Sequence, residues 1–179
     1  MGFEIVDSVL VRYYETTGVT DVVIPDSVTS IGKGAFQECD NLTIVTIPDS
    51  VTSIGNSAFE SCSNLTSVTI PDSVTSISYN TFLGCTNLTS VTIPNSVIII
   101  DDCAFQSCNL SSFTVPKTVK KVGKSSLRGC KEITVYDSID PDAKPCKNHS
   151  DGYHGTPNAS LGTVVNYFAN RNRLDYEVT

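Results

Sequence analysis

Large apolar residues recur along most of this chain at a spacing of 23 residues, with polar residues between them. Four columns of such positions can be followed through five successive segments. A repeat this short cannot bury its own apolar face, so it predicts a solenoid in which each rung packs against its neighbours. The columns are Val28, Val51, Val74, Val97 and Val119; Ile31, Ile54, Ile77, Ile100 and Val122; Phe36, Phe59, Phe82, Phe105 and Leu127; and Leu42, Leu65, Leu88, Leu110 and Ile133.

The order of apolar and polar residues within one repeat predicts the structure of a rung. Residues 65–70 alternate as in a short strand, and Pro71 ends it because proline cannot donate a ladder hydrogen bond. Residues 74–77 form a second short segment with apolar residues facing inward. The apolar positions of residues 81–85 follow at near-helical spacing, which predicts a short helical or 3₁₀ arc that closes the rung.

The two ends of the chain depart from the repeat. Residues 1–18 combine a β-rich stretch with a turn signal, which predicts an N-terminal capping strand or hairpin. Residues 19–136 hold about five repeats, and residues 137–179 predict a loop, a helix over 161–169 and a strand over 174–178 as a C-terminal cap. We therefore predict one α/β repeat solenoid domain, with short strands, short helical arcs and a cap at each end.

The repeat resembles that of the BspA-like leucine-rich repeats, whose consensus is roughly C-x-x-L-x-x-I-x-I-P-x-x-V-x-x-I-x-x-x-A-F-x-x-C. Residues 39–62 fit this pattern from Cys39 and Leu42 through Ala58 and Phe59 to Cys62. The departures elsewhere are Thr81 and Ser126 in place of alanine and Leu127 in place of phenylalanine. The resemblance implies a leucine-rich-repeat array from an extracellular or cell-surface protein of bacteria or parasitic protists. It implies binding to a host or neighbouring-cell protein, and neither an enzyme activity nor a cofactor.

Charge is unevenly distributed along the chain, whose formal net charge is −7. Residues 1–116 carry 12 acidic and 2 basic side chains, whereas residues 117–179 carry 7 acidic and 10 basic ones. An acidic repeat body argues against nucleic acid as a partner, because a phosphate backbone needs a basic surface. No apolar run approaches the roughly 20 residues of a membrane-spanning helix.

Five of the seven cysteines occupy one place in successive repeats, namely Cys39, Cys62, Cys85, Cys108 and Cys130. Cysteine packs as a small apolar residue, so we expect a column of buried free thiols. Neighbouring rungs would be close enough for a disulfide in principle, but the odd number of cysteines argues against a complete disulfide framework.

Two groups of residues are weak candidates for metal ligands. Cys146, His149 and His154 lie close together in the C-terminal segment and could supply three zinc ligands, but their spacing matches no zinc-finger pattern closely and a solvated loop is the simpler interpretation. Asp26, Asp49 and Asp72 form a column that could hold Ca²⁺ or could simply form the turns that follow the prolines. The column continues as Asn95 and Lys117, which argues against calcium. We predict no catalytic residue and no cofactor.

Partner-binding candidates lie where the repeat is broken. Ile98 and Ile99 replace the Thr-Ser pair of earlier rungs, so at least one of them should be exposed. The fifth rung is basic at outward positions, which could make a patch for acidic partners or a polar terminal repeat that aids solubility. Its basic residues are Lys117, Lys120, Lys121, Lys124, Arg128 and Lys131.

We predict a non-catalytic protein-interaction or adhesion module of a secreted or cell-surface protein. Two alternatives stay open: a surface module that binds carbohydrate or polyanion through the basic rung, and a structural spacer within a larger surface protein. Neither the spacing nor the composition separates these three.

Overall fold

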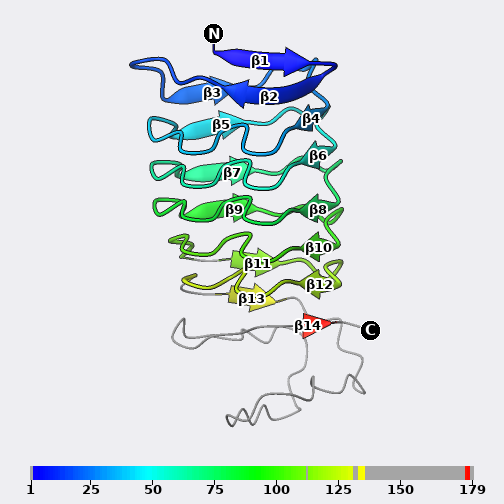
Figure 1. Ribbon diagram of the computed structural model, residues 1–179. Helices are drawn as coiled ribbons and strands as arrows, with labels where there is room; N and C mark the ends of the chain where they lie inside the picture. Colours follow the sequence, from blue (N-terminus) through cyan, green and yellow to red (C-terminus); the bar gives the residue numbers. More distant parts are fainter. Residues whose placement is uncertain (1, 112, 131–132, 136–175, 178–179) are drawn as a thin grey trace, which may run out of the picture.

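A computed structural model of the chain describes residues 2–111, 113–130, 133–135 and 176–177, which stack as successive rungs (Figure 1). We number the rungs by the residue each contributes to the phenylalanine column, from Phe36 in the first to Leu127 in the fifth. The strands are β1 (Phe3–Val6), β2 (Val9–Tyr13), β3 (Asp21–Val23), β4 (Ser30–Ile31), β5 (Ile44–Thr46), β6 (Ser53–Ile54), β7 (Ser67–Thr69), β8 (Ser76–Ile77), β9 (Ser90–Thr92), β10 (Ile99–Ile100), β11 (Phe113–Val115), β12 (Lys121–Val122), β13 (Ile133–Val135) and β14 (Tyr176–Glu177).

The strands form parallel ladders on two sides of the stack. On one side β3, β5, β7 and β9 pair in that order, and β11 pairs with β13. On the other side β2, β4 and β6 pair in order, as do β8, β10 and β12. Residues one repeat apart pair directly, as Val45 does with Val68, so the register of the sequence repeat is the register of the sheets.

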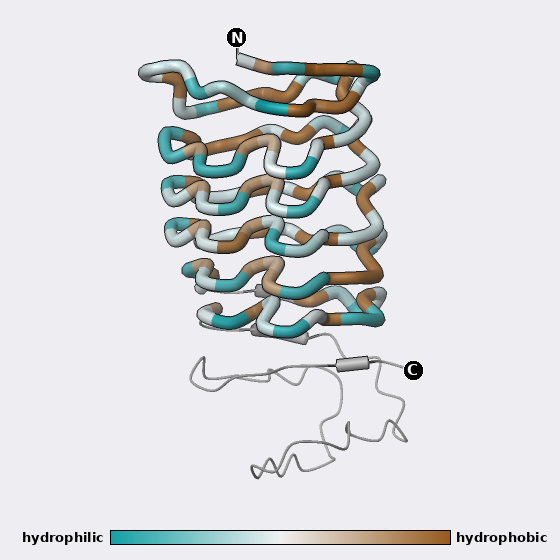
Figure 2. The backbone as a smooth tube through the Cα atoms, in the orientation of Figure 1, coloured by the Kyte–Doolittle hydropathy of each residue, from teal (hydrophilic) through white to brown (hydrophobic). Residues whose placement is uncertain are grey.

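The four predicted columns are confirmed as the core through the first four rungs, and Val119 and Leu127 continue two of them in the fifth, where Val122 is only partly buried. In the second rung Val51, Ile54, Phe59 and Leu65 each expose at most 2% of their surface. The apolar positions therefore recur at the same place in successive rungs (Figure 2). Each rung contributes too little apolar surface to be stable alone, so the array is stabilised by stacking.

The phenylalanine column is a continuous aromatic stack. Phe59 lies between Phe36 and Phe82, with ring centroids 4.9 Å and 5.3 Å away and interplanar angles of 13° and 5°. Nearly parallel rings at this centroid separation are offset, which is a favourable aromatic arrangement. The stack continues through Tyr13, whose ring centroid is 5.1 Å from that of Phe36, to Phe3 of β1.

The predicted helical arc is wrong, because no helix occurs among the residues that the structure describes. The segment is instead a series of hydrogen-bonded turns. Its successive N–H groups donate alternately to a carbonyl of the next rung and to a carbonyl three residues earlier in the same rung. The Phe59 N–H donates to the Thr81 carbonyl of the next rung at 2.9 Å, whereas the Glu60 N–H donates to the Ser57 carbonyl at 3.1 Å. Ser57 and Ser61 have φ of 57° and 61°, a left-handed conformation that interrupts any right-handed helix.

The N-terminal end is covered by the antiparallel hairpin of β1 and β2, and β2 pairs in parallel with β4. At the other end β14 pairs antiparallel with β12, which places residue 177 opposite Lys121. The loop, the helix over 161–169 and most of the 174–178 strand predicted for the C-terminal cap lie outside the described residues. No helix capable of crossing a membrane is found in the described part of the chain.

Candidate binding surface

The outer face of the β4–β6–β8 side is lined by two columns of hydroxyl side chains in the first three rungs. Thr29, Thr52 and Thr75 form one column and Ser30, Ser53 and Ser76 form the other. These hydroxyls are used within the scaffold: the Thr52 Oγ1 donates to the Thr29 carbonyl at 3.3 Å, and the Ser30 and Ser53 hydroxyls share a hydrogen bond of 2.7 Å. Because this arrangement repeats, the first three rungs offer a partner little that is distinctive.

The fourth rung breaks both hydroxyl columns with isoleucine. The Ile98 N–H donates to the Thr75 carbonyl at 2.9 Å, and Ile99 pairs with Ser76, so both side chains stand at hydroxyl positions. Ile98 is 41% exposed and Ile99 is half-buried, which confirms the prediction that at least one of them reaches solvent.

The fifth rung continues the same two columns with lysine. The Lys120 N–H donates to the Ile98 carbonyl at 2.8 Å, and Lys121 pairs with Ile99. Both lysines are exposed. The structure therefore brings four of the predicted candidates together as a two-by-two group, Ile98, Ile99, Lys120 and Lys121, which we call the Ile-Lys surface.

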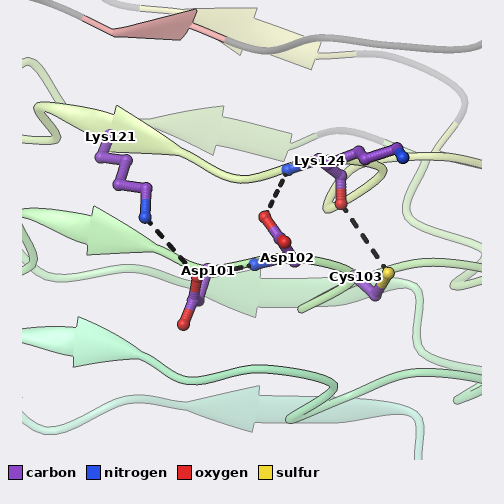
Figure 3. A network of polar contacts seen from close by, with 5 residues as sticks. All are labelled: Asp101, Asp102, Cys103, Lys121 and Lys124. Carbon is purple, nitrogen blue, oxygen red and sulfur yellow. Dashed lines mark hydrogen bonds and ion pairs between the residues drawn. The ribbon is translucent and has the colours of Figure 1, made fainter.

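Two aspartates beside this surface were missed by sequence reasoning (Figure 3). Asp101 lies 3.9 Å from the Lys121 Nζ, and Asp102 accepts a 2.7 Å hydrogen bond from the Lys124 N–H. Lys121 and Asp101 are 54% and 42% exposed, so solvent screening leaves this ion pair weak. The sequence does mark Asp101 as a change in the repeat, because it takes the position that Gly55 holds two rungs earlier.

A second exposed apolar pair was also missed. Val23 on β3 and Ile44 on β5 are 67% and 44% exposed, on the opposite side of the rungs. Val23 aligns with Thr46, and Ile44 aligns with Ser67, so both stand at positions where the later rungs carry hydroxyl side chains. Their surroundings differ from the Ile-Lys surface, because Asp21 and not lysine stands directly opposite Ile44.

The other predicted site residues do not join the Ile-Lys surface as one group. Lys117, Lys124 and Arg128 are exposed but occur on other stretches of the fifth rung. Lys131, Cys146, His149 and His154 lie outside the described residues. Within the described ranges there is no cluster of three or more residues able to hold a metal ion.

The cysteine column consists of buried free thiols. The Cys62 Sγ lies 3.0 Å from the Phe36 carbonyl, and Cys85 repeats this contact one rung later at 3.1 Å. Burial raises the pKa of Cys39 to about 12, so this thiol stays protonated at neutral pH and is a poor nucleophile. Cys103 is different, because it is only half-buried and lies outside the column.

Comparison with known proteins gives a consistent set of relatives. Residues 11–134 match the family described as "BspA type Leucine rich repeat region" in six copies. The match thus begins within β2, the strand that pairs with the first rung, and has one copy more than the five segments of the apolar columns. No match is found among curated proteins.

Solved structures with this architecture come from several bacteria. A leucine-rich repeat protein from Bacteroides ovatus is 34% identical with a TM-score of 0.63, over 70% of this chain and 35% of its own. The T. pallidum leucine-rich repeat protein is 26% identical with a TM-score of 0.66, over 73% and 66%. A leucine-rich cell surface protein from Faecalibacterium prausnitzii is 34% identical with a TM-score of 0.50, over 68% and 41%. The chain thus spans about a third to two thirds of the length of these proteins.

Proposed function

The chain belongs to the BspA-type leucine-rich repeat family, and from this premise we propose that it is a non-catalytic protein-binding module of a secreted or cell-surface protein. Leucine-rich repeats commonly serve as scaffolds for protein interaction, because stacked rungs present an extended surface that can vary without disturbing the core. A cell-surface location is supported by the similarity to the F. prausnitzii cell surface protein.

The Ile-Lys surface is the observation that carries the proposal. Two isoleucines break hydroxyl columns while the core column beside them keeps Ile100 fully buried, so the change affects the surface alone. Exposed apolar side chains beside charged ones are typical of partner surfaces. Adhesion through this surface follows if its partner is a protein of a host or neighbouring cell.

The proposal is tested by binding of the full chain to an array of purified extracellular matrix proteins. We expect saturable binding to at least one of them. The double variant Ile98→Thr and Ile99→Ser, which restores the residues of earlier rungs, should bind at least about tenfold more weakly with an unchanged thermal melt. The matched variant Val23→Thr and Ile44→Ser should bind like the parent.

Several outcomes would contradict this assignment. Unchanged binding by the Ile98/Ile99 variant would remove the Ile-Lys surface from the interface. Loss of binding in the Val23/Ile44 variant alone would transfer the interface to the opposite side. Absence of binding across the whole array would favour a structural spacer within a larger surface protein.

A second candidate function is binding of carbohydrate polyanions through the basic fifth rung. Lys117, Lys120 and Lys124 are exposed, and none makes an ion pair with another described residue. Sulfated glycans bind exposed cations of this kind through charge alone. Retention on a heparin column should fall in high salt and after Lys120→Thr and Lys124→Asn, whereas Ile98→Thr should have no effect.

A further inference from the structure

The Ile-Lys surface places an apolar group and a cation side by side along the solenoid axis, twice. Ile98 and Lys120 are joined by a backbone hydrogen bond of 2.8 Å, and Ile99 and Lys121 are paired residues of β10 and β12. Adjacent strands in a sheet lie about 4.8 Å apart. A partner that follows the axis would therefore meet two apolar side chains and then, one rung later, two cations.

The lysines are available to a partner carboxylate. Among the described residues, Lys120 has no ion pair, and Lys121 has only the long contact of 3.9 Å to Asp101. Lys120 and Lys121 are both exposed and carry positive charge. An acidic partner therefore suits this end of the sheet, while a basic one would be repelled.

We propose that the Ile-Lys surface binds an acidic amphipathic helix of a partner protein, an assignment that rests on the proposed binding function. In a helix, residues three or four apart lie on one face and are separated by a rise of about 4.5–6 Å, which matches the spacing of the rungs. Residues on one face of a strand are about 6.6 Å apart and fall out of step with the rungs. A helix about 10–12 Å across is also wide enough to cover both columns.

The helix would lie along the solenoid axis, with apolar side chains over the isoleucines and carboxylates over the lysines. The apolar residue and the acidic residue would be three or four positions apart on the helix. A sulfated glycan would use the lysines and leave the isoleucines uncovered, so the apolar pair favours a protein partner.

The test uses a fluorescein-labelled helical peptide of about 20 residues in which each leucine is followed four residues later by glutamate. Its matched control carries lysine in place of glutamate. Fluorescence anisotropy with the full chain should show saturable binding of the acidic peptide that weakens with salt, and no binding of the lysine peptide. The Ile98→Thr/Ile99→Ser and Lys120→Thr/Lys121→Ser double variants should each bind about tenfold more weakly.

A charge-reversal variant separates loss of the binding surface from loss of folding, because a misfolded chain would not gain binding to the lysine peptide. Lys120→Glu with Lys121→Glu should lose the acidic peptide and gain the lysine peptide. Equal binding of both peptides by the parent, or a failure of the isoleucine variant to weaken binding, would overturn the proposal. Heparin binding that depends on the lysines, with no binding of either peptide, would overturn it in favour of a glycan. If binding to the matrix-protein array depends on Ile98 but neither peptide binds, the proposal of a helical partner is refuted and the proposed binding function still holds.

Discussion

Replacing Phe59 by alanine removes one ring from the middle of the aromatic stack. The side chain is fully buried, and its ring lies 4.9 Å from Phe36 and 5.3 Å from Phe82 by centroid distance. Burial of about 200 Å² of phenylalanine surface at about 25 cal/mol/Å² corresponds to about 5 kcal/mol. Because substitutions of this kind cost about 3–5 kcal/mol in other proteins, we expect a loss in that range.

Urea unfolding followed by far-UV circular dichroism measures this loss directly. Phe59→Leu is the matched control, because the fifth rung already holds Leu127 in the same column with 7% of its surface exposed. It should cost less than about 1.5 kcal/mol, since it keeps most of the buried volume. A loss of less than about 1 kcal/mol for Phe59→Ala, or equal losses for the two variants, would refute the stacked core as the main source of stability.

Three further predictions concern thiols and the backbone. Burial raises the pKa of Cys39 from 9.0 to about 12, so the unfolded chain releases this proton first as pH rises. Stability against urea should therefore fall between pH 9 and 12, with a shallower fall in Cys39→Ala, and equal slopes would contradict the burial argument. Iodoacetamide at about pH 8 should label Cys103 before the five column thiols, as peptide mass spectrometry can show. Gly55→Ala should destabilise the fold by about 1–3 kcal/mol, because the new Cβ would lie 2.8 Å from the backbone nitrogen of Lys33. An unchanged thermal melt would argue against this contact.

The core could be predicted from the sequence because the same positions of every repeat are apolar in a solenoid. The columns that contain Val51, Ile54, Phe59 and Leu65 were each identified from spacing alone, and the parallel registers place them one above another. The repeat thus supplied several independent copies of the same pattern, which reduces the ambiguity of any single short apolar run.

The turn segment was not predictable in the same way. The spacing of Thr81, Phe82 and Cys85 fits one turn of helix, but the N–H groups of this segment are shared with the neighbouring rung. The Phe82 N–H, for example, donates to the Ala104 carbonyl at 2.8 Å. Such pairing needs residues in the left-handed conformation at fixed places, here Asn80 and Gly84. Of the two, only the glycine is a residue type that indicates this conformation from the sequence.

The candidate surface was half visible in the sequence. Ile98 and Ile99 and the lysines were recognised as breaks in the repeat, but their proximity depends on the stacking of β10 and β12. The exposed pair Val23 and Ile44 was not predicted, because valine and isoleucine also occur at inward positions. Only the strand register assigns these two side chains to the outer face.

The most direct test of the account is a footprint of the bound partner by hydrogen–deuterium exchange. The full chain would be compared alone and with the matrix protein that it binds on the array. We predict slower amide exchange over residues 98–101 and 120–124 in the complex, with no change over residues 44–46. Protection over residues 44–46, or equal exchange over residues 98–101 with and without partner, would contradict the claim that the breaks in the repeat on β10 and β12 form the binding surface.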